Sequence, residues 1–139
     1  MFILVIRFVV KNTFQETRFF EQNIVQETTL LKKYIPPNTP VFFYNTPSNY
    51  MIGAELIPTK PWADTFSWYL EVPGMQEAII AFLEKNQTRV IIFQPFQGNE
   101  TTMLGSYIPQ KIDEYVSVYY PNRMNIASNL WLLQRSSSQ

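Results

Sequence analysis

Apolar and polar residues along this chain alternate with the spacings of helices and short strands. From Phe14 to Ile35, apolar side chains recur every four or seven residues with polar residues between them. This spacing predicts an amphipathic helix that buries one face. The same pattern predicts helices over residues 74–86 and 107–120, and a short helix over Tyr50 to Leu56.

Three shorter runs are apolar without alternation. They are Pro40 to Tyr44, Arg89 to Gln94, and Leu130 to Leu133 at the end of the stretch from Asn125 to Arg135. Continuous apolar runs are typical of strands buried on both faces, as in a parallel sheet covered by helices. The order helix–strand–helix–strand–helix–strand therefore predicts an α/β fold, with a small, mostly parallel sheet of three to four strands and helices on its faces.

The length of 139 residues is common for one domain. We expect a single α/β domain over residues 14–135, an apolar segment over residues 1–13, and a frayed tail over residues 136–139. Met1 to Val10 carry only one charge, on Arg7, but a bilayer-spanning helix needs about 20 apolar residues. This run is either the start of a buried strand or helix, or the last turns of a membrane helix truncated at an internal methionine.

The amino-acid composition excludes several classes of functional site. Eleven basic and eleven acidic residues give a formal net charge of zero, without the basic excess that nucleic-acid binding requires. The chain contains neither cysteine nor histidine, which excludes Ser-His-Asp triads, thiolate nucleophiles and metal sites built from those residues. Its four glycines lack the spacing of a nucleotide-binding loop. We therefore expect no metal site, no cofactor and no nucleic-acid partner.

The segment P-W-A-D-T-F-S-W-Y-L-E-V-P-G, residues 61–74, is unusually rich in aromatic side chains. Tryptophan and tyrosine combine an apolar body with a polar tip, so they suit interfaces and membrane surfaces, and they stack on sugar rings. A carboxylate among such rings can have a raised pKa or hold sugar hydroxyls. The candidate substrate- or interface-facing residues are Trp62, Asp64, Trp68, Tyr69 and Glu71.

Structural alternatives remain open for these residues. Trp68 and Tyr69 would complete the core, and Asp64 and Glu71 would fix the loop through hydrogen bonds or ion pairs. An independent small enzyme would have to depend on Asp64 or Glu71 with a strongly shifted pKa.

The run from Ile57 to Gln76 resembles a segment of the soluble C-terminal regions of bacterial multi-pass GT-C glycosyltransferases, the relatives of protein mannosyltransferases and aminoarabinose transferases. Similar features are the strand after P-P-N-T-P, the strand ending in F-Q-P-F, and the closing run Trp131 to Arg135. The resemblance covers the chain from about Phe19 onward.

The resemblance implies a non-catalytic, extracytoplasmic domain of a membrane-associated transferase that uses a polyprenyl-phosphate-linked sugar donor. Catalytic and metal-binding residues of that family lie in its membrane part, so none is carried over to this chain. The implied partners are the membrane-embedded transferase portion and a glycan or lipid-linked sugar. The alternative is a free-standing module that binds a carbohydrate or a protein.

Overall fold

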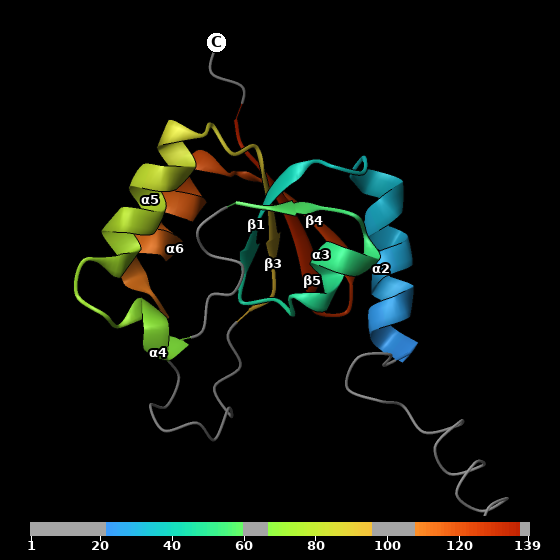
Figure 1. Ribbon diagram of the computed structural model, residues 1–139. Coiled ribbons are helices and arrows are strands. Elements are labelled where there is room, and N and C mark those ends of the chain that lie inside the picture. Colours follow the sequence, from blue (N-terminus) through green and yellow to red (C-terminus); the bar gives the residue numbers. More distant parts are fainter. Residues whose placement is uncertain (1–21, 60–66, 96–107, 137–139) are drawn as a thin grey trace, which may run out of the picture.

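The computed structural model describes residues 22–59, 67–95 and 108–136. A five-stranded sheet in the order β2-β1-β3-β5-β4 lies between two layers of helices (Figure 1). The strands are β1 (Pro40–Tyr44), β2 (Ile57–Pro58), β3 (Val90–Phe93), β4 (Asn122–Ala127) and β5 (Leu130–Gln134). The helices α2 (Gln22–Tyr34) and α3 (Asn49–Gly53) cover one face, and α4 (Ser67–Leu70), α5 (Met75–Lys85) and α6 (Gln110–Tyr119) cover the other.

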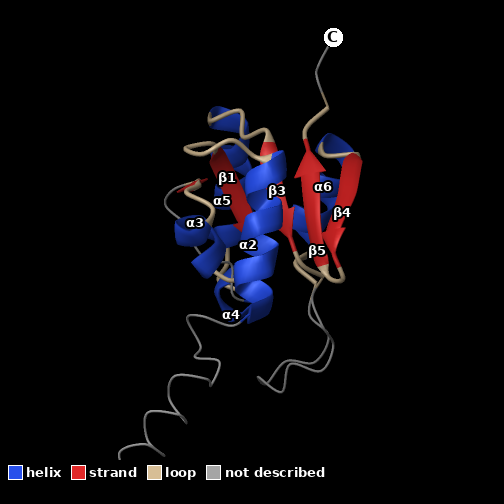
Figure 2. Ribbon diagram, turned by 90° about the vertical axis from the view of Figure 1, so that its right-hand side faces the viewer, coloured by secondary structure: helices blue, strands red, loops and turns tan. Residues whose placement is uncertain are grey.

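Alternation along the central strands divides the core between the two faces. Val41 and Phe43 of β1 pack beneath α2 and α3, whereas Phe42 and Tyr44 pack beneath α5 and α6. Successive side chains of a strand point to opposite faces, so a strand covered on both sides must be apolar throughout. Figure 2 views the sheet from the α2 side, with that helix in front of the strands.

The α/β class and the helices on both faces are confirmed, but the predicted sheet was wrong in strand number and direction. The sheet has five strands and is mixed: β1 runs parallel to β2 and β3, whereas β5 runs antiparallel to both β3 and β4. Only Ser128 and Asn129 separate β4 from β5. So short a connection permits only an antiparallel pair, because parallel strands need a crossover of a dozen or more residues.

The two missed strands lack a strand pattern in the sequence. β2 is two residues long and contains Pro58. β4 is exposed along its first four residues, from Asn122 to Asn125, so no apolar run marks it. Both are edge strands, where proline and polar residues are tolerated because one side of the backbone pairs with nothing.

The predicted helices are present in the described residues with other bounds, and α3 covers Asn49–Gly53 in place of Tyr50 to Leu56. In the described chain α2 begins at Gln22. α5 covers Met75–Lys85, where residues 74–86 were predicted, and α6 covers Gln110–Tyr119, where residues 107–120 were predicted. Gly74 precedes α5 with φ at +82°, a conformation that glycine adopts without strain. None of the helices in residues 22–59, 67–95 and 108–136 combines the length and apolar character needed to cross a bilayer. The apolar segment over residues 1–13 lies outside the described residues.

Candidate functional site

The connections after β1 and β3 lead to opposite faces of the sheet. β1 is followed by α3, whose Tyr50 packs on the α2 face. The next described element after β3 is α6, whose Ile112 and Val116 pack on the opposite face. β1 leads on to β2 at one side of the sheet, whereas β3 leads on to β4 and β5 at the other. In open α/β sheets, ligands bind outside the carboxyl ends of the strands where connections diverge in this way.

Four side chains meet at this point, and we call Glu27, Asn45, Tyr50 and Gln94 the switch-point cluster. Asn45 Nδ2 donates to the backbone oxygen of Gln94 at 3.0 Å, which ties the end of β1 to the end of β3. Gln94 Nε2 donates to the hydroxyl oxygen of Tyr50 at 3.3 Å. The Tyr50 hydroxyl in turn donates to the Glu27 carboxylate.

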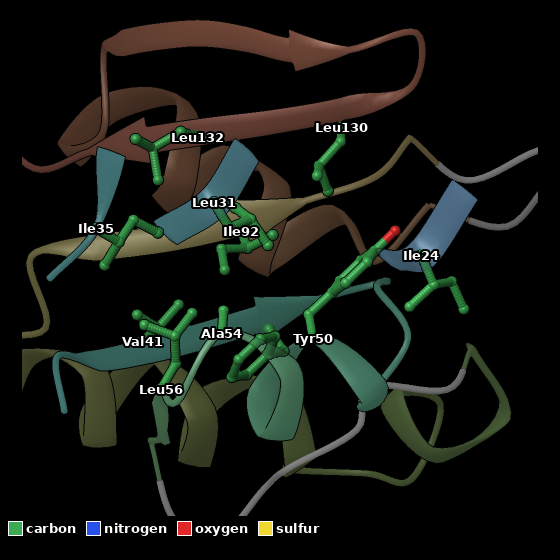
Figure 3. Packing of buried hydrophobic residues seen from close by; sticks show 11 residues of the cluster. Ile24, Leu31, Ile35, Val41, Tyr50, Ala54, Leu56, Ile92, Leu130 and Leu132 are labelled. Carbon is green, nitrogen blue, oxygen red and sulfur yellow. The ribbon is translucent and has the colours of Figure 1, made fainter. Parts of the chain in front are cut away.

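Tyr50 links the cluster to the core. Its ring is buried with Val41, Ala54 and Leu56, and its hydroxyl lies at the end of the apolar cluster where Ile24 is found (Figure 3). A buried phenol needs a hydrogen-bond partner, and both Glu27 and Gln94 meet this need. The ring therefore holds the polar groups in place at the carboxyl edge of the sheet.

The chemistry of the cluster suits a neutral, hydroxyl-rich ligand. Two amides, a phenol and a carboxylate offer both donors and acceptors. The cluster contains no lysine or arginine, the residues that usually bind phosphate. Thr46 follows Asn45 directly and is also buried, and its hydroxyl has no hydrogen-bond partner within the described structure. A buried hydroxyl without a partner is costly, so Thr46 lowers the stability of this end of β1.

The structure places only part of the predicted aromatic site. Trp62 and Asp64 lie outside the described residues, and Trp68 is part of the short helix α4. Tyr69 is half-buried and Glu71 is exposed. Leu70, next to Tyr69 in α4, is fully buried and contributes to the core.

Sequence reasoning missed the switch-point cluster. Asn45 directly follows the predicted strand Pro40 to Tyr44, and Gln94 ends the predicted run Arg89 to Gln94, so both are polar residues at the ends of buried strands. A polar residue at the carboxyl end of a buried strand indicates such a site, because the carboxyl ends of neighbouring parallel strands lie at one edge of the sheet. Glu27 and Tyr50 carry no comparable signal.

Two carboxylates elsewhere form exposed ion pairs. Lys32 lies 2.8 Å from Glu55, and this hydrogen bond and charge lower the pKa of the Glu55 carboxyl. Lys111 pairs with Glu77, and the hydrogen bond that it donates lowers the pKa of that carboxyl. In the described ranges, no three aspartate or glutamate side chains gather as metal ligands would.

A second feature is an apolar groove between α2 and α3. It has a volume of about 590 Å³ and is lined by Ile24, Val25, Thr28, Thr29, Lys32, Asn49, Ile52 and Gly53. Val25 is 53% exposed and Ile52 is 79% exposed. The two helices lie side by side on the same face of the sheet (Figure 2).

Comparisons of this chain with protein-family models, with curated proteins and with solved structures find no match. The resemblance of Ile57–Gln76 to the C-terminal regions of GT-C glycosyltransferases therefore stays a prediction.

Proposed function

We propose that this chain is a non-catalytic sugar-binding domain that forms the extracytoplasmic C-terminal part of a membrane glycosyltransferase. The transferase would take its sugar from a polyprenyl-phosphate donor, and its membrane portion would do the chemistry. The observation that carries the binding role is the switch-point cluster, in which Asn45 joins the ends of β1 and β3 and Gln94 continues to Tyr50 and Glu27.

The type of polar group supports a sugar as the ligand. Sugar hydroxyls both donate and accept, and amide and carboxylate side chains match them in both roles. The resemblance of Ile57–Gln76 supports the transferase context. On this proposal Trp62, Trp68 and Tyr69 face the acceptor or the membrane portion, where their rings offer stacking surfaces.

Sugar binding is tested with a pair of asparagine variants. Both Asn45 and Asn38 have positive φ, at 54° and 61°, so glycine fits the backbone at either position. Asn45→Gly removes the amide of the cluster, whereas Asn38→Gly removes an exposed amide before β1. Titration of neutral oligosaccharides followed by amide NMR shifts should show binding that Asn45→Gly weakens about fivefold, the effect of one neutral hydrogen bond. Asn38→Gly should leave the affinity unchanged. Absence of binding by the unmodified chain would remove the sugar-binding role.

The transferase context is tested separately. An antibody against this domain should detect, in the native cells, a membrane-bound protein several times larger than the 16.4 kDa of this chain. A soluble band near that mass would contradict the transferase context. It would support the alternative, a free-standing module that binds a carbohydrate or a protein.

A further inference from the structure

The α2–α3 groove is an apolar surface without a cover in the described structure. Val25 from α2 and Ile52 from α3 line it and are more than half exposed, although both sit beside the buried Ile24. A groove with exposed apolar groups offers a surface on which another apolar segment can pack. The groove extends over α2 from Ile24 to Lys32, which is about 12 Å at the rise of an α-helix.

The chain itself contains a segment of matching character and length. The described chain begins at Gln22, two residues before the first residue of the groove, and 21 residues precede it. The first ten, Met1 to Val10, are apolar except for Arg7. Ten residues span about 15 Å as a helix. The sequence predicts that the helix extends back to Phe14, about 15 Å before Ile24 at the rise of an α-helix. The thirteen residues before Phe14 span up to roughly 43 Å when extended, which is enough for a return to the groove.

We propose that the α2–α3 groove is the docking site of the chain's own apolar segment, Met1–Val10. Docking removes Val25 and Ile52 from water together with the apolar side chains of the segment, and this burial is the driving force. The inference goes beyond the proposed function and does not depend on it. If a membrane helix continues upstream of Met1, docking of its last residues seats the domain against the membrane.

Cysteine crosslinking of the full chain tests the proposal, because the chain has no cysteine of its own. Single cysteines at positions 3, 4, 5 and 6 are each combined with Ile52→Cys, or with Val118→Cys as the control. Val118 is a 67% exposed apolar residue of α6, on the opposite layer. Under mild oxidation at low protein concentration, at least one pair with Ile52→Cys should form an intramolecular disulfide about tenfold faster than its Val118→Cys counterpart. Equal rates, or crosslinks only between two molecules, would overturn the proposal; the second result would assign the groove to another copy of the chain.

Proteolysis of the same region provides a readout without cysteines. Ile52→Glu places a charge in the groove and should speed tryptic cleavage after Arg7 roughly fivefold, because the undocked segment is cleaved. Val118→Glu should leave the rate unchanged. If both variants are cleaved at the rate of the unmodified chain, the segment does not dock in the groove. None of these results bears on sugar binding, so failure here is distinct from failure of the proposed function.

Discussion

The backbone of Gly53 in α3 lies directly against the side chain of Thr28 in α2. A Cβ atom at position 53 would lie 2.7 Å from Thr28 Cγ2 and 3.0 Å from its Oγ1. Real side chains do not approach so closely, and a β-branched threonine has little freedom to turn away. The absence of a side chain at Gly53 therefore sets how closely α2 and α3 pack, and with it the shape of the groove between them.

Gly53→Ala should destabilise the protein by about 1–3 kcal/mol, because the added methyl group overpacks the contact with Thr28. Urea denaturation measures the change in the free energy of unfolding. The double variant Gly53→Ala/Thr28→Ala should recover most of the loss, since it removes the clashing atoms. Equal losses with and without Thr28→Ala would show that the contact is not the cause.

Gln76 connects three helices on the opposite face. Its Oε1 accepts from the backbone N–H groups of Lys111 and Ile112, at 3.1 and 3.4 Å, and its Nε2 donates to the Leu70 oxygen at 3.2 Å. These N–H groups lie in the first turn of α6, where no carbonyl of the helix accepts their hydrogen bonds. Gln76→Ala should reduce the free energy of unfolding by about 1–2 kcal/mol.

The matched control for Gln76 is Gln110→Ala, a change at an exposed glutamine of α6. It should alter the free energy of unfolding by less than about 0.5 kcal/mol. A comparable loss in both variants would contradict a specific contribution of the hydrogen bonds that Gln76 makes to α4 and α6.

Tyr50→Phe should cost about 1–2 kcal/mol, because it leaves Gln94 Nε2 without its acceptor and the Glu27 carboxylate without its donor. The ring stays in the core, so the loss reports the hydroxyl alone. Tyr34→Phe removes an exposed hydroxyl at the end of α2 and serves as the control in the same urea titrations. Indistinguishable losses would show that the hydrogen bonds of the Tyr50 hydroxyl contribute nothing to stability.

Tyr120 should make stability depend on alkaline pH. Its hydroxyl donates to the Thr88 oxygen at 2.7 Å, and burial raises its pKa above the ordinary value of 10.0. The unfolded chain therefore loses this proton first as the pH rises. The stabilisation by Tyr120 is complete below pH 10 and declines as the pH rises above it.

The difference in unfolding free energy between the unmodified chain and Tyr120→Phe should accordingly shrink above pH 10. Burial also raises the pKa of Tyr115, so part of the alkaline loss will persist in this variant. A constant difference between pH 8 and 11 would contradict the role of Tyr120.

The sequence by itself determined the elements whose signal is local. Helical spacing placed α2, α5 and α6, and the apolar run from Pro40 to Tyr44 gave β1 its correct bounds. These predictions succeeded because a helix face or a doubly buried strand repeats its pattern within a few residues. Binary patterning likewise predicted helices on both faces of the sheet.

Only the tertiary structure decided strand direction and the candidate site. β4 carries no apolar pattern because its first residues face solvent, and its tight turn to β5 made the sheet mixed. Asn45 and Gln94 are 49 residues apart in the chain and meet only because β1 and β3 pair in parallel. Glu27 and Tyr50 join them through the packing of α2 and α3 on that sheet. Such juxtapositions depend on how distant surfaces are buried together, and no local spacing encodes them.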